Sequence, residues 1–360
     1  MVGRTLGIYM TAKVAKAVFG ALGLIFSLIF IVDFIETLRR SGDAKDVSTA
    51  TILAISFLRT PSIVEQTIPF AMLFGAMVAF LGLSRRLELV VIRASGVSAW
   101  QFLAPIFALA IAMGLAASLA FNPLAAIMKA KCDAMEAGLS GRARADNAEA
   151  RWLRQKSADG QAVIRASSSA EGGVVLGGAT FFNFSPDGQF ENRVEAREAR
   201  LRDGFWELQD ARLLSPDREP EPYGTYQIAT NLTVEQVRQT FEKAETVPFW
   251  SLPAAIRLAT AAGLDANKYL LQYQTLMARP VLLLAMAMIA ATVSLRFFRF
   301  GGVGPMIAGG VAAGFVLYVV TQMAGDLGSA GMLNPSVAAW TPAVVGTLFG
   351  VAMLLKQEDG

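Results

Sequence analysis

The sequence predicts an α-helical polytopic membrane protein with six transmembrane helices and one inserted, all-β domain. Of its 61 Lys, Arg, Asp and Glu residues, 37 lie between Pro123 and Asp265. Three long stretches on either side of the charged block carry no charge, and the first of them overlaps the start of the block: Ala94–Met128, Phe300–Gly325 and Leu327–Leu355. A helix needs about 20 apolar residues to cross the hydrocarbon core, so each stretch is long enough to span.

Composition supports a membrane protein and excludes several classes of site. Hydrophobic residues make up 54% of the chain and charged residues 17%, whereas a soluble domain has about 25% charged residues. The chain has no His, and Cys132 is its one cysteine. These counts exclude a Ser-His-Asp triad, a His-ligated metal, an internal disulfide and a Cys-cluster metal site. No phosphate-binding G-x-x-x-x-G-K-[ST] loop is present. We therefore expect no catalytic residue, no metal site and no cofactor bound by this chain.

The six spans follow from the apolar runs in order. Met1–Lys16 does not match a signal peptide, because a long apolar run follows it without a small-residue cleavage site, so we expect a retained first span. Pro61 is expected to open the second span, after a loop at Leu38–Arg59. The predicted spans are Val14–Ile35, Ser62–Leu83, Trp100–Phe121, Tyr269–Leu295, Val303–Gly325 and Pro335–Leu355. Gly310-x-x-x-Gly314 is expected to serve helix packing.

Lys and Arg in the short loops orient the chain. Most of them fall on one side of a six-span arrangement, which we predict to be cytoplasmic together with both termini: Arg4, Lys13, Lys16, Arg85, Arg86, Arg93, Arg296, Arg299 and Lys356. The loop Leu38–Arg59 opposes this bias, because its cations would lie outside. The predicted domains are residues 1–122 with spans one to three, 123–265 as an exported domain, and 266–360 with spans four to six.

The exported block has the pattern of an antiparallel β domain. Its strand-like runs are separated by turn sequences such as Asp203-Gly204 and Pro186-Asp187-Gly188. Short strands at this spacing favour a sandwich or roll. The predicted strands are Ala162–Ala166, Gly173–Phe184, Val194–Arg202 and Gly204–Leu214, and the predicted flanking helices are Leu124–Leu139, Thr233–Ala244 and Ser251–Ala262.

A short amphipathic helix is predicted on the cytoplasmic side, between spans two and three. Leu87, Val90, Val91 and Ala94 recur at helical spacing, and Gly96 is placed to end the helix. Such a helix suits docking into a groove on a partner protein. It equally suits an interfacial helix whose Arg residues lie at lipid headgroups.

The stretch Arg86-Leu-Glu-Leu-Val-Val-Ile-Arg-Ala-Ser-Gly96 resembles the cytoplasmic signature of the LptF/LptG (YjgP/YjgQ) family of lipopolysaccharide-export permeases. Leu38–Gly42 and the end of the β block favour the LptG-like member over its LptF-like sister. Further matches run in the family's order along nearly the whole chain: Pro61, Pro69–Gly75, Thr230–Thr233, Tyr269–Gln272 and Gly314–Tyr318.

The resemblance implies one half of an ABC transporter in the bacterial inner membrane, with a periplasmic β-jellyroll-like domain. A sister permease of LptF type would form the other half, and a dimer of a cytoplasmic LptB-type ATPase would use ATP and Mg. The machine would extract lipopolysaccharide and pass it to periplasmic LptC- and LptA-type β-jellyroll proteins. No nucleic-acid partner is implied. The alternative from another class is a membrane-anchored structural or sensory protein, which co-purification would distinguish.

The resemblance also implies roles for individual residues. Residues 84–98 would be the coupling helix, and Glu88 its acidic contact with the ATPase. Asp33 departs from the family's pattern, because some relatives have Lys there. The implied ATPase-binding residues are Arg86, Leu87, Glu88, Val91, Arg93 and Gly96, and the implied lipid-binding residues are Arg39, Arg40, Glu36, Phe315 and Tyr318. Headgroup anchoring is the alternative for the two arginines.

Three charges within or near the spans need a separate interpretation. Ionisable groups in a membrane suggest function by default. For Glu65 and Arg279 we favour structural pairing. The role of Asp326, which is isolated in sequence from other charges, stays open.

Overall fold

A computed structural model describes residues 4–41, 48–140, 151–157, 160–170, 173–185, 187–216, 219–234, 237, 244–261, 266–300 and 303–358. Among these residues, six helices are long and apolar enough to cross a membrane, which confirms the six predicted spans. The chain forms two compact units. The helical unit comprises Met1–Met135, Glu245–Leu252 and Asn267–Gly360, and the second unit holds the β-sheet.

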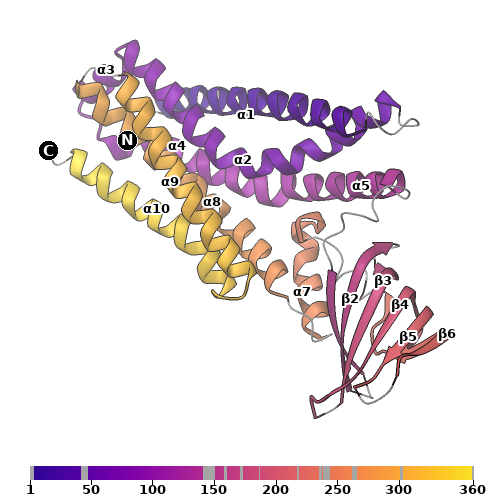
Figure 1. Cartoon of the computed structure of the whole chain (residues 1–360). Helices are drawn as coiled ribbons and strands as arrows, with labels where there is room; N and C mark the ends of the chain where they lie inside the picture. The colour runs from indigo at the N-terminus through magenta and orange to yellow at the C-terminus, as the bar shows by residue number, and fades with distance from the viewer. Residues whose placement is uncertain are drawn as a thin grey trace. The chain divides into compact units, whose positions relative to one another are not determined.

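The helical unit is built from long, mostly apolar helices that lie alongside one another (Figure 1). The third span continues through a π-helical turn at Ala117–Phe121 directly into α5, so it is longer than predicted. The helices are α1 (Arg4–Ser41), α2 (Thr49–Arg85), α3 (Glu88–Ala94), α4 (Ala99–Ala116), α5 (Asn122–Ser140), α8 (Asn267–Phe300), α9 (Val303–Ser329) and α10 (Pro335–Glu358).

The predicted loop at Leu38–Arg59 is wrong at both ends, because α1 continues to Ser41 and α2 begins at Thr49. The Ser48 side chain accepts a hydrogen bond from the Thr51 amide and caps α2. Arg59 lies inside α2, and its guanidinium is 2.9 Å from the Asp33 carboxylate on α1. The predicted second span began too late, at Ser62, because a cation among membrane helices is tolerated where it is paired.

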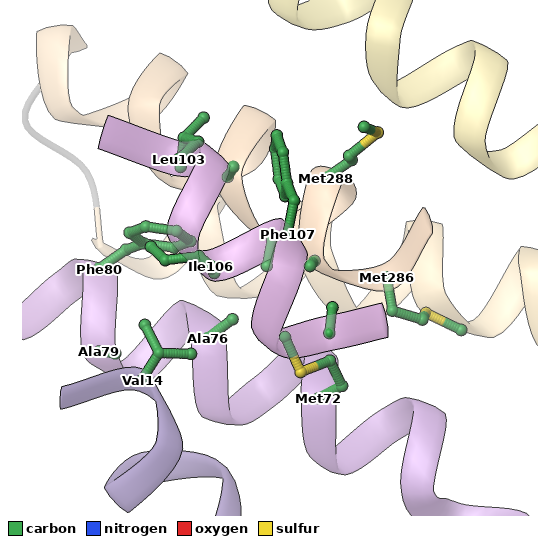
Figure 2. Close-up of a cluster of buried hydrophobic side chains, with 14 of the residues drawn as sticks. Val14, Met72, Ala76, Ala79, Phe80, Leu103, Ile106, Phe107, Met286 and Met288 are labelled. Carbon is green, nitrogen blue, oxygen red and sulfur yellow. The ribbon is translucent and has the colours of Figure 1, made fainter. Parts of the chain in front are cut away.

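One apolar core joins α1, α2, α4 and α8. Figure 2 shows part of it, including Val14, Phe80, Ile106 and Met286. Close helix contacts depend on glycine in places. A Cβ at Gly314 of α9 would overlap a Leu73 side chain of α2, and Gly310 meets α2 in the same way. The packing role expected for the Gly310-x-x-x-Gly314 spacing is therefore confirmed.

A buried polar network lies among these helices. Glu65 on α2 forms an ion pair with Arg279 on α8, and their side chains are only 8% and 11% exposed. The Asn122 side chain donates to the Glu65 carboxylate (2.9 Å), and its oxygen accepts from the Phe249 amide (3.0 Å). The structural pairing predicted for Glu65 and Arg279 is thus confirmed. Within the helical unit, the network thus joins α2, α8, the start of α5 and the segment Glu245–Leu252.

The second unit contains a six-stranded antiparallel sheet in the order β1-β2-β3-β4-β5-β6. Each strand pairs with its sequence neighbours, so the described strands form a meander. The inserted β domain is confirmed, but its topology is a single meandering sheet rather than a two-sheet jellyroll. The prediction omitted the first and last strands. The strands are β1 (Arg151–Ser157), β2 (Gly160–Ala170), β3 (Val175–Phe184), β4 (Phe190–Arg202), β5 (Phe205–Leu214) and β6 (Glu221–Ala229).

The residues in the turns and the alternation of apolar and polar residues along the strands explain why this segment forms a sheet with one buried face. Gly204 and Gly188 have φ of +85° and +80°, as their hairpin turns require. One face carries the core, in which the Phe181 and Trp206 rings lie 6.0 Å apart. The Trp206 indole donates to the buried Gln155 side chain (3.1 Å). These two aromatic residues are therefore structural.

Two of the three predicted flanking helices of the β block are observed. α5 matches the helix predicted at Leu124–Leu139, and α7 (Leu252–Ala261) matches the one predicted at Ser251–Ala262. Most of the helix predicted at Thr233–Ala244 lies outside the described residues.

We predict that Arg279→Met destabilises the helical unit. Removing one partner of a buried ion pair leaves an uncompensated charge, at a cost of about 3–5 kcal/mol. The thermal unfolding midpoint in detergent should fall clearly. Arg39→Met is the control, because the Arg39 side chain is exposed and its loss should change the midpoint little. Equal midpoints for the two variants would contradict a stabilising role for the buried pair.

Candidate functional site

The predicted coupling helix at residues 84–98 is interrupted by a sharp turn. α2 ends at Arg85, and the Leu87 amide donates to the Ser84 carbonyl. Leu87 has φ of +59°, a conformation that is uncommon outside glycine because it brings the Cβ atom close to the following carbonyl oxygen. α3 then begins at Glu88. The prediction that Leu87 belongs to a continuous helical face is therefore wrong, because the left-handed turn separates it from α3.

α3 has a buried side and an exposed side. Leu89 and Ile92 are buried in the core of the helical unit. Leu87 and Val91 point away from it, with 60% and 67% of their surface exposed. The side chains of Val90 and Arg93 lie outside the described set. The structure thus presents two large apolar side chains, Leu87 just before α3 and Val91 on it, while the other side of the helix is already packed.

Glu88 is bound within the chain. The Lys13 ammonium on α1 lies 2.9 Å from one carboxylate oxygen and 3.0 Å from the other. The Tyr9 hydroxyl also donates to this carboxylate (3.0 Å). The hydrogen bond from Lys13 lowers the pKa of the Glu88 carboxyl, so the group stays ionised at neutral pH and loses the contact only in acid. The predicted acidic contact therefore has a partner on α1.

The predicted lipid-binding cations lie in the last turns of α1. The Arg39 guanidinium is exposed and lies 3.1 Å from the Glu36 carboxylate. The Arg40 side chain lies outside the described set. One to two turns earlier, Asp33 pairs with Arg59. This pairing accounts for the acidic residue that departs from the family's pattern.

Phe315 and Tyr318 occupy different environments on α9. The Tyr318 ring packs against Phe70 of α2, with centroids 5.2 Å apart. It lines a cavity of about 350 Å³ between α2, α8, α9 and α10, whose wall also includes the Glu65–Arg279 pair. Phe315 is exposed and is not part of this wall. The structure therefore does not bring these two residues together with Arg39 into one pocket.

Sequence reasoning missed the partners of the charged residues. Lys13 was assigned only as part of the cytoplasmic charge bias, Tyr9 was given no role, and Arg59 was placed in a loop. The i, i+4 spacing of Tyr9 and Lys13 put them on one helical face. Nothing in the sequence indicated that both side chains would contact Glu88, which lies 75 positions after Lys13 and 79 after Tyr9.

Comparison with known proteins identifies the family. The family model described as "Lipopolysaccharide export system permease LptF/LptG" matches residues 8–356. This chain belongs to the LptF/LptG family. It is 22% identical to the "Lipopolysaccharide export system permease protein LptG" of Escherichia coli K12, over 97% of this chain and 98% of that protein. The protein of the same name from Escherichia coli O6:H1 gives the same values.

Membership of the LptF/LptG family agrees with the architecture. A permease family that spans nearly the whole chain, together with six membrane-spanning helices, makes this a multi-pass inner-membrane protein. The predicted coupling segment corresponds to α3 and the turns that bound it.

Gly96 should matter through its backbone. Its φ is +82°, and nothing lies within 4 Å of where a Cβ would be. A larger residue would therefore strain the backbone without a steric clash with neighbouring atoms. We predict that Gly96→Val destabilises the turn after α3, whereas Gly96→Asn is tolerated because Asn adopts this conformation more readily. Limited proteolysis of the segment between α2 and α4 measures the effect. Equal proteolysis of the two variants would show that the turn does not require this conformation.

Proposed function

We propose that this chain is the LptG-like permease subunit of an ABC transporter that extracts lipopolysaccharide from the inner membrane and passes it toward the outer membrane. The observation that carries the proposal is the exposed apolar pair Leu87 and Val91 beside a helix that is packed on its other side. Exposed apolar residues at one site are typical of a protein interface. The similarity to E. coli LptG over the length of both chains supports this assignment.

The docking surface is proposed to face the cytoplasm and a dimeric LptB-type ATPase. An even number of spans places both termini and α3 on one side of the membrane, and the Lys and Arg of the short loops favour the cytoplasm for that side. ATP and Mg would then be bound by the ATPase, because this chain has no phosphate-binding loop. Arg86, which is exposed at the end of α2, would lie at the edge of the interface.

The other proposed partners can be assigned to exposed surfaces on α1, α9 and β6 of this chain. α1 is the least buried of the six spans and α9 the next, so both have apolar faces available to an LptF-type sister permease and to lipid. β6 lies at one edge of the sheet and its side chains are mostly exposed. An edge strand can extend a sheet into a partner, which suits transfer to LptC- and LptA-type β-jellyroll proteins.

Leu87→Gly should weaken ATPase binding without harming the fold. Glycine adopts φ near +60° at no steric cost, so the turn is retained while the apolar side chain is lost. Burial of a Leu side chain is worth about 1.5–3 kcal/mol, which corresponds to about tenfold or more in affinity. ATPase co-purification measures the loss, and Val91→Asp should show it more strongly.

Leu87→Met is the matched control for these variants. It keeps an apolar side chain of similar volume, so it should retain binding. If Leu87→Gly and Val91→Asp both retain the ATPase as the parent does, α3 is not the docking surface.

Arg39 and Arg40 are proposed to meet the phosphates of lipopolysaccharide at the outer end of α1. Guanidinium groups bind phosphate through paired hydrogen bonds. Replacing both with Glu should reduce lipid that co-purifies with the complex, while ATPase assembly is unchanged because α3 lies at the other end of α1. Replacing both with Lys should do less harm. Normal lipid content in the double Glu variant would make these arginines interfacial anchors only.

A further inference from the structure

Three polar side chains form a closed cluster between the first helix and the docking helix. The Lys13 ammonium donates to the Tyr9 hydroxyl (2.8 Å) and to the Glu88 carboxylate (2.9 Å), and the Tyr9 hydroxyl donates to the same carboxylate (3.0 Å). The side chains of Lys13 and Glu88 are 24% and 26% exposed. We name these three residues the α1–α3 clamp.

The sequence of α1 explains where the clamp lies. Met10, Val14 and Val18 recur every four residues and are fully buried, so they define the face of α1 that packs on the helical unit. Tyr9 and Lys13 each precede one of these residues by one position. They therefore lie along the border of the buried face, where the ends of long side chains can reach α3 and still contact water.

The clamp differs in kind from the other attachment of α3. Leu89 and Ile92 hold the helix through apolar packing, which is not directional and tolerates a small shift or rotation. The clamp acts through charge-assisted hydrogen bonds, which require a defined distance and direction. Apolar packing thus keeps α3 on the helical unit, and the clamp sets its position relative to α1.

α1 has a second ion pair near its other end. Asp33 contacts Arg59 of α2 at 2.9 Å, and both side chains are largely buried. Lys13 and Asp33 are 20 residues apart, which is about 30 Å along an α-helix and similar to the thickness of the hydrocarbon core. α1 is therefore a continuous rod with one polar attachment near each face of the membrane.

We propose that Glu88 is a positioning residue that links the docking helix to α1 through Lys13 and Tyr9, so that movement of α3 by the bound ATPase displaces α1. The inference rests on the proposed function, because it needs an ATPase that docks on α3. It assigns docking to the exposed side chains of Leu87 and Val91, and transmission to the clamp, which holds Glu88 at the border between the exposed and the buried side of α3. Loss of the clamp should therefore leave the complex assembled, but less lipid should be released for each ATP hydrolysed.

The test uses the complete complex of this chain with its ATPase and sister permease, reconstituted in liposomes that contain purified lipopolysaccharide. Lys13→Met should retain ATPase co-purification and the parent's unfolding midpoint, and Glu88→Gln is compared with it for transport. Lipid released per ATP hydrolysed should fall by about fivefold, the effect of losing a partly exposed ion pair worth about 1 kcal/mol. Lys16→Met removes an exposed cation one turn further along α1 and should match the parent.

The charge-swapped variant, Lys13→Glu with Glu88→Lys, decides the assignment. An ion pair between these residues is re-formed in the swap, so lipid released per ATP should return to within about twofold of the parent. If both single variants lose transport and the swap does not restore it, Glu88 acts on a group outside this chain and the inference is overturned. Single variants that transport as the parent does would also overturn it.

Failure of the proposed function would be distinguishable from failure of the clamp. If the parent chain does not co-purify with an ATPase, the proposed function fails before any clamp variant is compared. If a single variant lowers the unfolding midpoint and the swap restores both stability and ATPase binding but not transport per ATP, the clamp is only structural and the inference is again overturned.

Discussion

The pairing of charges inside the helical unit is the constraint on which this structure depends. Glu65 is held by Arg279 and Asn122, and Asn122 in turn accepts the amide of Phe249. A carboxylate among membrane helices is costly unless it is paired, so the network permits only arrangements that bring α2, α8 and the start of α5 together. The apolar core drives association without specifying register, and the polar network specifies it.

The same network joins two segments of the helical unit that are far apart in the sequence. Asn122 at the start of α5 and Phe249 in the segment before α7 both lie in this unit, and one hydrogen bond of 3.0 Å joins them. The Trp250 indole adds another bond to the Leu119 carbonyl within the π-helical turn. These bonds hold the two segments together within the helical unit.

The coupling segment combines local strain with a polar attachment. A left-handed Leu87 directs an apolar side chain outward immediately before α3, where a glycine would form the turn more easily. An unfavourable residue at such a turn is best explained by what its side chain contacts. The Lys13–Glu88 pair joins this segment to the most exposed of the six spans. Docking and transmission are thus proposed for different side chains of one short segment.

The sequence by itself determined the features that depend on neighbouring residues. Long apolar runs with few charges located six spans because hydrocarbon excludes unpaired charge, and Asp203-Gly204 located a hairpin because glycine adopts positive φ. The signature Arg86–Gly96 led to the family, which the family model over residues 8–356 confirms, whereas the coupling role of this segment stays a prediction. Four of the six strands were found, and β1 and β6 were missed because their polar residues obscure the alternation.

Only the tertiary structure decided which polar residues meet. Glu88 pairs with Lys13, from which it is separated by 75 positions in the sequence. The other two pairs, Asp33 with Arg59 and Glu65 with Arg279, are separated by 26 and 214 positions. No local pattern encodes such separations, because they depend on how whole helices pack. The error at Leu38–Arg59 has the same origin. Arg59 was assigned to the loop before the second span, whereas in the folded chain it lies inside α2 and pairs with the carboxylate of Asp33. Local chemistry fixes where a helix can form, but the free energy of a buried charge depends on its partner, and the fold alone supplies that partner.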